Sequence, residues 1–276
     1  MRKYLSNNFD CNKVVDFYDE IPIWSSPFGI KLLDYIDYKI NITALDIGCG
    51  TGFPLIELAM RLGENSIIYG IDPWKEAIGK VKNKIDYYQL ANVQIIEGVA
   101  ESIPLDNESV DLIVSNNGIN NVNSVDKVFY ECSRVIKEGG QFIFTFNTDR
   151  TMIEFYTEYE KILSELKLHN EIHLLNKHIH KKRPPVDEII NKVEKYGFIV
   201  NEMVEDQFNY KFTDGSAMLN HYFICLAFME SWVKLLPRNK VGLVFDLIEK
   251  NLNELSEKQG VFKLTIPFVL INSIKK

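Results

Sequence analysis

The segment Ala44–Gly52, with the sequence ALDIGCGTG, constrains the fold of this chain more than any other. A short apolar run leads to Asp46, and three glycines then stand at alternate positions: Gly48, Gly50 and Gly52. Pro54 follows, at a position that suits the first turn of a helix. Because glycine has no Cβ, the backbone can turn sharply here and approach a ligand closely. A strand, a glycine-rich turn and a helix in this order predict an open α/β sheet with a ligand at the carboxyl ends of its strands.

Apolar runs and helical patterns alternate along the next hundred residues. The strand-like runs are 42–47, 66–71, 93–97, 110–115 and 141–147, and the helix-like stretches are 54–62, 74–90 and 124–137. This order predicts a mostly parallel sheet with helices on both faces, which is a doubly wound, Rossmann-like α/β fold. We interpret Lys137–Gly140 as a helix stop, because glycine commonly follows the last helical residue.

The second half of the chain is less regular. Helical patterns cover 151–168, 186–196 and 213–256. A strand-like stretch at 198–212 follows the second of them, and another at 260–273 follows the third. We expect helical insertions that cap a site. Pro267 inside the last strand predicts a bulge, because proline cannot donate to a sheet ladder. Residues 10–38 are rich in aromatic side chains, and we expect one or two helices there, with simple packing as the alternative role of each aromatic residue.

Net charge and hydropathy limit the partners of this chain. The formal net charge is −7, and an acidic surface repels phosphate, so we expect no nucleic acid and no anionic membrane as partner. No apolar run approaches the roughly 20 residues of a membrane helix, and no signal peptide is visible. The four cysteines lie far apart without a CxxC pair, so neither a zinc site nor a disulfide framework is predicted. We therefore expect a cytoplasmic protein with reduced cysteines.

The spacing of the glycines limits which ligands the turn can bind. A dinucleotide fingerprint requires G-x-G-x-x-G, but its third glycine would fall on Phe53, and no Walker A sequence follows. G-x-G-x-G with an acid two residues before the first glycine instead fits S-adenosylmethionine (SAM), which has an amino-acid end and no phosphate. Asp72, in the sequence YGIDPW, ends the second strand-like run and can accept hydrogen bonds from both ribose hydroxyls, or it can cap the next helix. Trp74 can then pack against adenine, with the Ala100 N–H and the Glu101 carboxylate at the adenine edge.

Four segments together resemble class I SAM-dependent methyltransferases, in particular the group of ubiquinone- and menaquinone-biosynthesis-type enzymes. They are ALDIGCGTG, YGIDPW, GVAESIPLDNESVDLIVS and ECSRVIKEGGQFIF, in that order. The resemblance covers roughly the first 150 residues. It implies a seven-stranded sheet and a single domain over residues 1–276, with an N-terminal helical cover at 1–40 and helical insertions near 151–184 and 213–258.

The resemblance also assigns residues to the cofactor. It implies that Gly48–Gly52, including Cys49, wraps the amino-acid end of SAM, and that Asp46 supports this loop or reaches the ligand's ammonium through water. The ribose and adenine are expected against two further groups of residues, Asp72, Pro73 and Trp74, and Val99, Ala100 and Glu101. The methionine side is expected at Ser115 and Asn116, with Tyr18 near its carboxylate.

This chain differs from many relatives at two places that bear on adenine binding and on general-base catalysis. Many relatives have an acid where Val99 stands, which leaves Glu101 for the adenine amine. Many also have a histidine pair where this chain has Asn120 and Asn121, so no general base is assigned. The asparagines can orient a substrate, or they can be a polar loop that caps the next helix. We name Asn120, His221 and Tyr222 as candidate substrate contacts and leave the catalytic residue unassigned.

Two segments of the second half remain open. His169, His173, His178 and His180 cluster among lysines, and a solvated basic stretch, anionic substrate recognition and a metal site all remain alternatives, with no metal in our prediction. The apolar side chains between Met218 and Trp232 either line a substrate pocket or form the core of the cap.

We therefore predict a SAM-dependent methyltransferase that acts on a small organic acceptor by in-line displacement, as a monomer or homodimer. A non-catalytic SAM-binding or regulatory module and a nicotinamide-dependent oxidoreductase are the alternatives.

Overall fold

The computed structural model describes residues 3–5, 15 and 24–276, and Tyr18 lies outside them. The chain divides into two compact units. The sheet unit comprises Val15–Thr148, Pro185–Asp206 and Phe268–Lys276, and the helical unit comprises Met1–Val14, Asp149–Pro184 and Gln207–Pro267. The predicted insertions at 151–184 and 213–258 fall in the helical unit, and the single domain over 1–276 stays a prediction.

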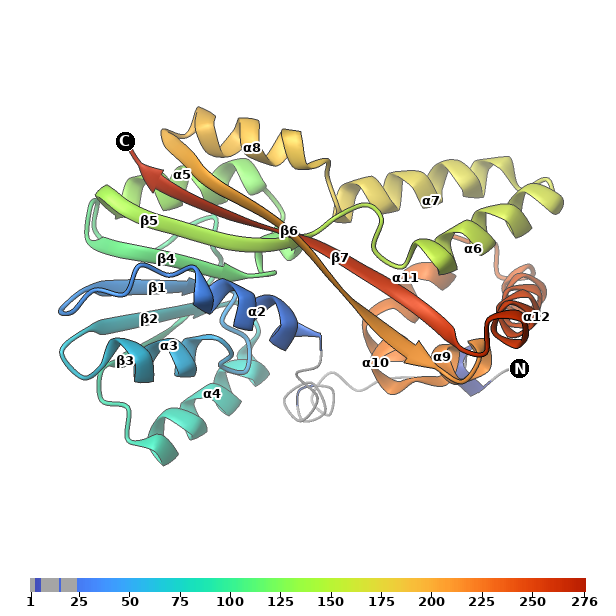
Figure 1. The fold of residues 1–276 in the computed structure, drawn as a ribbon, viewed down its shortest axis with the longest axis horizontal. Coiled ribbons are helices and arrows are strands. Elements are labelled where there is room, and N and C mark those ends of the chain that lie inside the picture. Colours follow the sequence, from blue (N-terminus) through green and yellow to red (C-terminus); the bar gives the residue numbers. More distant parts are fainter. Residues whose placement is uncertain (1–2, 6–14, 16–23) are drawn as a thin grey trace. The chain divides into compact units, whose positions relative to one another are not determined.

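The described residues form a sheet of seven strands in the order β3-β2-β1-β4-β5-β7-β6, and part of β6 and of β7 belongs to the helical unit (Figure 1). The strands are β1 (Thr43–Ile47), β2 (Ile67–Asp72), β3 (Val93–Glu97), β4 (Val110–Asn116), β5 (Ile136–Asn147), β6 (Phe198–Phe212) and β7 (Phe262–Lys275). Strands β1 to β5 pair in parallel, and β7 pairs antiparallel with β5, from Gln141 with Ile274 to Asn147 with Phe268. The predicted seven-stranded, mostly parallel α/β sheet is confirmed.

Helices cover both faces of this sheet because its strands are apolar on both sides. They are α2 (Ser25–Asp34), α3 (Leu55–Leu62), α4 (Lys75–Tyr88), α5 (Val125–Val135) and α8 (Val186–Lys195), with a short 3₁₀ turn η2 (Ile119–Asn121). Successive strand residues face opposite layers. Leu45 packs in one core with side chains of α5 and α8, whereas Ala44 packs in the other with side chains of α2 and α3.

The predicted helix stop at Lys137–Gly140 is wrong. Helix α5 ends at Val135, and β5 begins at Ile136, which pairs with Val110. The next pair, Leu112 with Gln141, advances two residues on β4 and five on β5, so the glycines belong to an irregular strand. A Cβ on Gly140 would lie 2.6 Å from the Ile136 side chain, which explains why glycine is needed there.

The helical unit contains α6 (Ile153–Glu165), α7 (His169–Lys182), α9 (Gly215–Asn220), α10 (Tyr222–Ile224), α11 (Glu230–Val233) and α12 (Val241–Gln259). It also holds a 3₁₀ turn η1 (Lys3–Leu5) and a π-helical turn η3 (Cys225–Met229). Asp214 starts α9 as expected, because its carboxylate accepts the N–H of Ala217. None of the helices in the described residues has the length and apolarity to cross a membrane.

Trp232 is the centre of the helical unit's core. Its ring is fully buried and stacks on Phe155 with the centroids 3.9 Å apart, and also on Phe228. Its Nε1–H donates to the Tyr156 hydroxyl at 3.0 Å, and its carbonyl accepts from Tyr159. The apolar residues between Met218 and Trp232 therefore supply core packing, which is the second of the two roles left open above.

Candidate functional site

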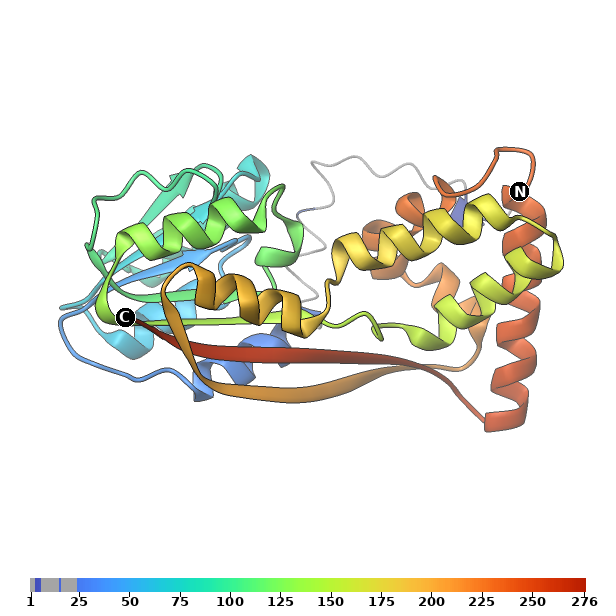
Figure 2. The same cartoon turned by 90° about the horizontal axis from the view of Figure 1, so that it is seen from above.

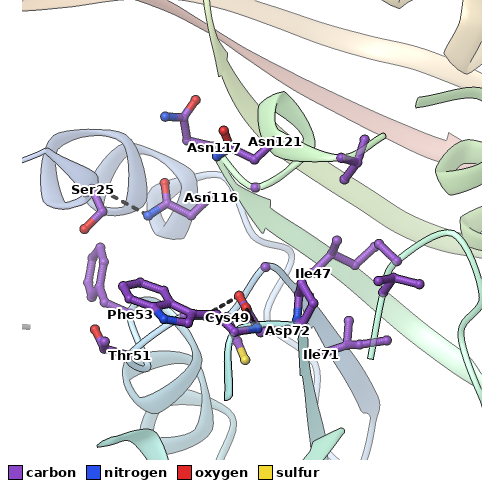
Figure 3. Close-up of a pocket in the computed structure, with 18 of the residues that line it drawn as sticks. Ser25, Ile47, Cys49, Thr51, Phe53, Ile71, Asp72, Asn116, Asn117 and Asn121 are labelled. Atoms are coloured by element: carbon purple, nitrogen blue, oxygen red, sulfur yellow. Dashed lines mark hydrogen bonds between the residues drawn. The ribbon is translucent and has the colours of Figure 1, made fainter. Parts of the chain in front are cut away.

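A cavity of about 510 Å³ lies in the sheet unit at the carboxyl ends of three neighbouring strands. Ile47, Asp72 and Asn116 are the last residues of β1, β2 and β4, and all three line it. Figure 3 shows Asn116 and Asn117 on one side of the space, with Cys49 and Asp72 on the other. This is the edge at which open α/β sheets bind ligands.

The glycine loop forms the floor of the cavity. The N–H groups of Gly48 and Cys49 both donate to the Ile71 carbonyl, at 2.9 and 3.3 Å. Gly48 has a φ of +76°, and a Cβ there would lie 3.0 Å from the Gly118 backbone. The loop therefore needs glycine for both its conformation and its close contact with the loop after β4. Cys49 also lines the cavity, and burial raises the pKa of its thiol, so the thiol stays protonated.

Asp72 connects this loop to the next one. One carboxylate oxygen accepts the Gly50 N–H at 2.9 Å, and the other accepts the Trp74 N–H at 2.8 Å. The residue is only 9% exposed, and burial raises the pKa of its carboxyl. Helix α4 begins after Trp74, so Asp72 supports the turn before the helix while its carboxylate also faces the cavity. Pro73 and Trp74 line the cavity beside it.

Asp46 lies beneath the loop rather than in the cavity wall. Its side chain is fully buried, and neither carboxylate oxygen has a hydrogen-bond partner. Burial, with a further contribution from the nearby Asp72 carboxylate, raises its pKa to about 8. Burial therefore favours the protonated, neutral form of Asp46 at neutral pH.

The loop after β3 places Val99, Ala100 and Glu101 in the cavity wall. One oxygen of Glu101 accepts the N–H groups of Asn123 and Ser124, at 2.7 and 3.1 Å, just before α5 begins. Glu101 thus satisfies donors that precede the helix, and its second oxygen is the one left for a ligand. This structural task was not foreseen from the sequence.

The loop after β4 differs from the sequence assignment. Asn116 lines the cavity, and its amide donates to the Ser25 carbonyl at 3.0 Å. Ser115 is fully buried and donates to the Ile47 carbonyl, so it joins two strands and is not among the lining residues. Asn120 also stays out of the wall and donates to the Asn117 side chain.

Several lining residues were missed by the sequence analysis. They are Trp24, Ser25, Ser26, Ile47, Phe53, Ile71, Lys84, Asn117, Gly118, Val122 and Asn123. The polar segment after β4 was a signal for two of them, Asn117 and Asn123, but the sequence did not show which amides face inward.

The remaining candidates lie in the helical unit or outside the described residues. His221 and Tyr222 belong to the helical unit, and the His221 ring contacts the Phe212 ring at 5.4 Å. The histidines at 169–180 lie on α7, and within the described residues no three His, Cys, Asp or Glu side chains are placed to hold a metal ion. The Tyr18 assignment falls outside what the structure describes.

Comparison with known proteins agrees with this geometry. Residues 45–144 match the sequence model of a family described as a methyltransferase domain. A demethylmenaquinone methyltransferase of Bacillus mycoides is 29% identical over 155 residues, which are 56% of this chain and 64% of that relative. The chain thus spans less than two thirds of that relative's length.

Solved structures share the fold at low sequence identity. The YcgJ protein of Bacillus subtilis has a TM-score of 0.57 at 17% identity, over 91% of this chain and 98% of its own. A geranyl diphosphate C-methyltransferase of Streptomyces coelicolor has a TM-score of 0.56 at 18% identity, over 100% and 88%. The resemblance drawn from the four motifs is confirmed over residues 45–144, which match a methyltransferase domain.

Proposed function

We propose that this protein is a methyltransferase that transfers the methyl group of SAM to a small organic acceptor by in-line displacement. The cavity is the observation that carries this proposal, because four separate loops bring their motif residues to its wall. Its volume of about 510 Å³ falls within the roughly 300–1,000 Å³ of small-molecule sites. A flat surface over the glycine loop would have favoured a partner-binding module instead.

The residues present fit the parts of SAM. The glycine loop offers exposed backbone without Cβ atoms, which suits the amino-acid end. Asp72 offers a nearly buried carboxylate for the ribose hydroxyls, and hydrogen bonds to a charged acceptor are among the stronger ones. Ala100 and Glu101 lie in the wall where we place the adenine.

Methyl transfer in this site depends above all on the position of the acceptor relative to the methyl group. The sulfonium supplies an electrophilic methyl group, and the acceptor forms a bond to that carbon while the carbon–sulfur bond breaks and its electron pair stays on sulfur. The protein contributes alignment of the acceptor and exclusion of water. Among the described residues, the ionisable side chains in the wall are Cys49, Asp72, Lys84 and Glu101, and Asp72 and Glu101 are assigned to the cofactor. We therefore assign acceptor orientation to the amides of Asn117 and Asn121, and no residue as a base.

The acceptor is defined only by class. The relatives named above act on a quinone precursor and on a prenyl diphosphate by their names, and both are small organic molecules. The net charge of −7 further favours a small acceptor over a nucleic acid.

Ligand titration separates the candidate functions. Calorimetric titration of the whole chain should detect binding of S-adenosylhomocysteine (SAH) and SAM but not of NAD. Incubation with methyl-labelled SAM and a panel of quinols, prenyl diphosphates and small amines should then transfer label to an acceptor. Tight binding of NAD would replace this proposal with an oxidoreductase, and SAH binding without transfer to any acceptor would favour the non-catalytic module.

A further inference from the structure

Arg183 is a buried cation that the proposed methyl transfer does not use. It follows α7 directly in the helical unit, and its backbone N–H donates to the Ile179 carbonyl at 2.9 Å. The residue is 6% exposed. Its guanidinium lies over the ring of Tyr156 on α6, 5.2 Å from the ring centroid. Helices α6 and α7 run side by side in both views (Figures 1 and 2).

The partners of this guanidinium do not balance its charge. Its Nη1 donates to the Thr151 carbonyl at 3.3 Å, and that oxygen, like the Tyr156 ring, is neutral. Among the described residues, no carboxylate oxygen lies within 4.0 Å of it. Arginine is almost never buried unless it is paired, because the loss of hydration is costly. Among the residues that the structure describes, Arg183 therefore has no carboxylate to balance its burial.

The guanidinium has more donors than the described part of the protein uses. An arginine has five N–H donors, and Arg183 uses only the Nη1 bond among the described residues. None of its other nitrogens is sealed from solvent without a partner. A planar edge with unused donors matches the geometry of a phosphate or carboxylate group.

Lys181 and Lys182 precede Arg183 in the chain and carry the same sign of charge. Burial, helped by these three cations, lowers the pKa of His178, so its imidazole is favoured in the neutral form. The C-terminal dipole of α7 favours cations and accounts for exposed lysines there. It does not account for burial of a guanidinium beside them, because the exposed position would gain the same attraction at less cost.

We propose that Arg183, with Lys182 next to it in the chain, forms an oxyanion site that binds a phosphate group. The ligand is either a small molecule that carries a phosphate or free inorganic phosphate or pyrophosphate, since both present the same oxygen atoms. The site lies in the helical unit and does not rest on SAM binding.

Isothermal titration of the whole chain with pyrophosphate, inorganic phosphate and phenyl phosphate tests the site. Arg183→Gln should weaken pyrophosphate binding about 10- to 100-fold, as expected for loss of charged hydrogen bonds. Lys182→Gln changes an exposed residue and should weaken it less. Arg238→Gln removes one positive charge at an exposed position of the same unit and should leave binding unchanged.

Two results would overturn the site. One is pyrophosphate binding that is absent, or that is equal in the wild type, Arg183→Gln and Lys182→Gln. The other is displacement of pyrophosphate by saturating SAH, which would place the anion in the cofactor cavity. Tighter binding of phenyl phosphate than of inorganic phosphate would support the site and identify an organic phosphate as its ligand, and the reverse order would support the site with the free anion. SAH affinity should be the same in Arg183→Gln, so failure of this site and failure of the proposed function are separable.

Discussion

The cavity of the sheet unit and the core of the helical unit are assembled from the chain in different ways. In the sheet unit, the cavity is lined by short segments that follow individual strands, such as Gly48–Thr51 after β1 and Asp72–Trp74 at the end of β2. In the helical unit, Trp232 stacks on Phe228, four residues earlier, and contacts Phe155 and Tyr156 on α6, which lies far from it in the chain. The candidate site is thus built from short segments at strand ends that the sheet topology brings together, whereas the helical core depends on packing between whole helices.

This difference explains what changes in each unit should do. A strand of a parallel sheet must end at the ligand edge, so the residue that follows it is delivered there by topology alone. The aromatic core has no such rule, because its stability comes from mutual packing of large side chains. Changes in the helical core should therefore act on stability, and changes at strand ends should act on ligand affinity.

The largest effect is expected for Trp232→Ala. Loss of a fully buried tryptophan should lower the free energy of unfolding by about 3–5 kcal/mol. Denaturant unfolding measures this, and Tyr87→Ala, at a side chain that is 82% exposed, is the control with almost no expected effect. The folded variant should bind SAH as the wild type does. Loss of SAH binding in a folded Trp232→Ala protein would break the comparison between the units.

The second largest effect is expected at Asp46, in the pH dependence of the free energy of unfolding. Its pKa of about 8 means that the folded protein keeps a proton that the unfolded chain releases near pH 4. Its neutral form therefore contributes stability that is complete below about pH 4 and is lost as the pH rises toward 8. Asp46→Asn removes this titration. The free energy of unfolding of the variant should therefore rise relative to that of the wild type by up to about 1.4 kcal/mol per pH unit in that window.

Unfolding free energies of both proteins across this window provide the measurement. Asp149→Asn, at an exposed carboxyl, should instead follow the wild-type curve. Parallel curves for Asp46→Asn and the wild type would show that Asp46 is not held neutral beneath the loop.

Asp72→Ala tests the strand-end residues directly. It removes the acceptor proposed for the ribose hydroxyls, so SAH affinity should fall about 10- to 100-fold. Glu97→Ala, at the end of the adjacent strand β3 and outside the cavity wall, should leave that affinity unchanged. Equal affinities for the wild type and Asp72→Ala in calorimetric titration would refute the ribose assignment.

The smallest effect is expected for Glu101. Glu101→Ala leaves the Asn123 and Ser124 N–H groups before α5 without their acceptor and should cost about 1 kcal/mol of stability. Glu101→Gln keeps an oxygen in place and should cost less, and Glu138→Ala provides an exposed control. If Glu101→Ala is as stable as Glu138→Ala in denaturant unfolding, the helix contact is unimportant.

Sequence patterns predicted the sheet unit well for a physical reason. Strands such as Val93–Glu97 are short apolar runs bounded by turn residues, and their alternation with helices leaves few possible topologies. The same patterns misplaced Lys137–Gly140, because glycine serves a helix end and a strand irregularity equally well. They also could not distinguish Asn120 from Asn121, since a turn of η2 decides which amide faces the cavity.

The helical unit was predicted only in outline. Helical periodicity indicated α6 and α12 but not their partners, because long-range packing leaves no local signature. Arg183 shows the same limit, since its burial against Tyr156 and Thr151 depends on how α7 meets α6. The cluster of histidines on α7 is visible in the sequence, whereas nothing in the sequence indicates that the arginine after them is buried.

The structure of this chain bound to SAH tests the central claim most directly. We predict that the ribose hydroxyls contact the Asp72 carboxylate, that the amino-acid end lies over Gly48–Gly52, and that the adenine lies beside Ala100 and Glu101. Ligand density away from Asp72 and the glycine loop would refute this cofactor site.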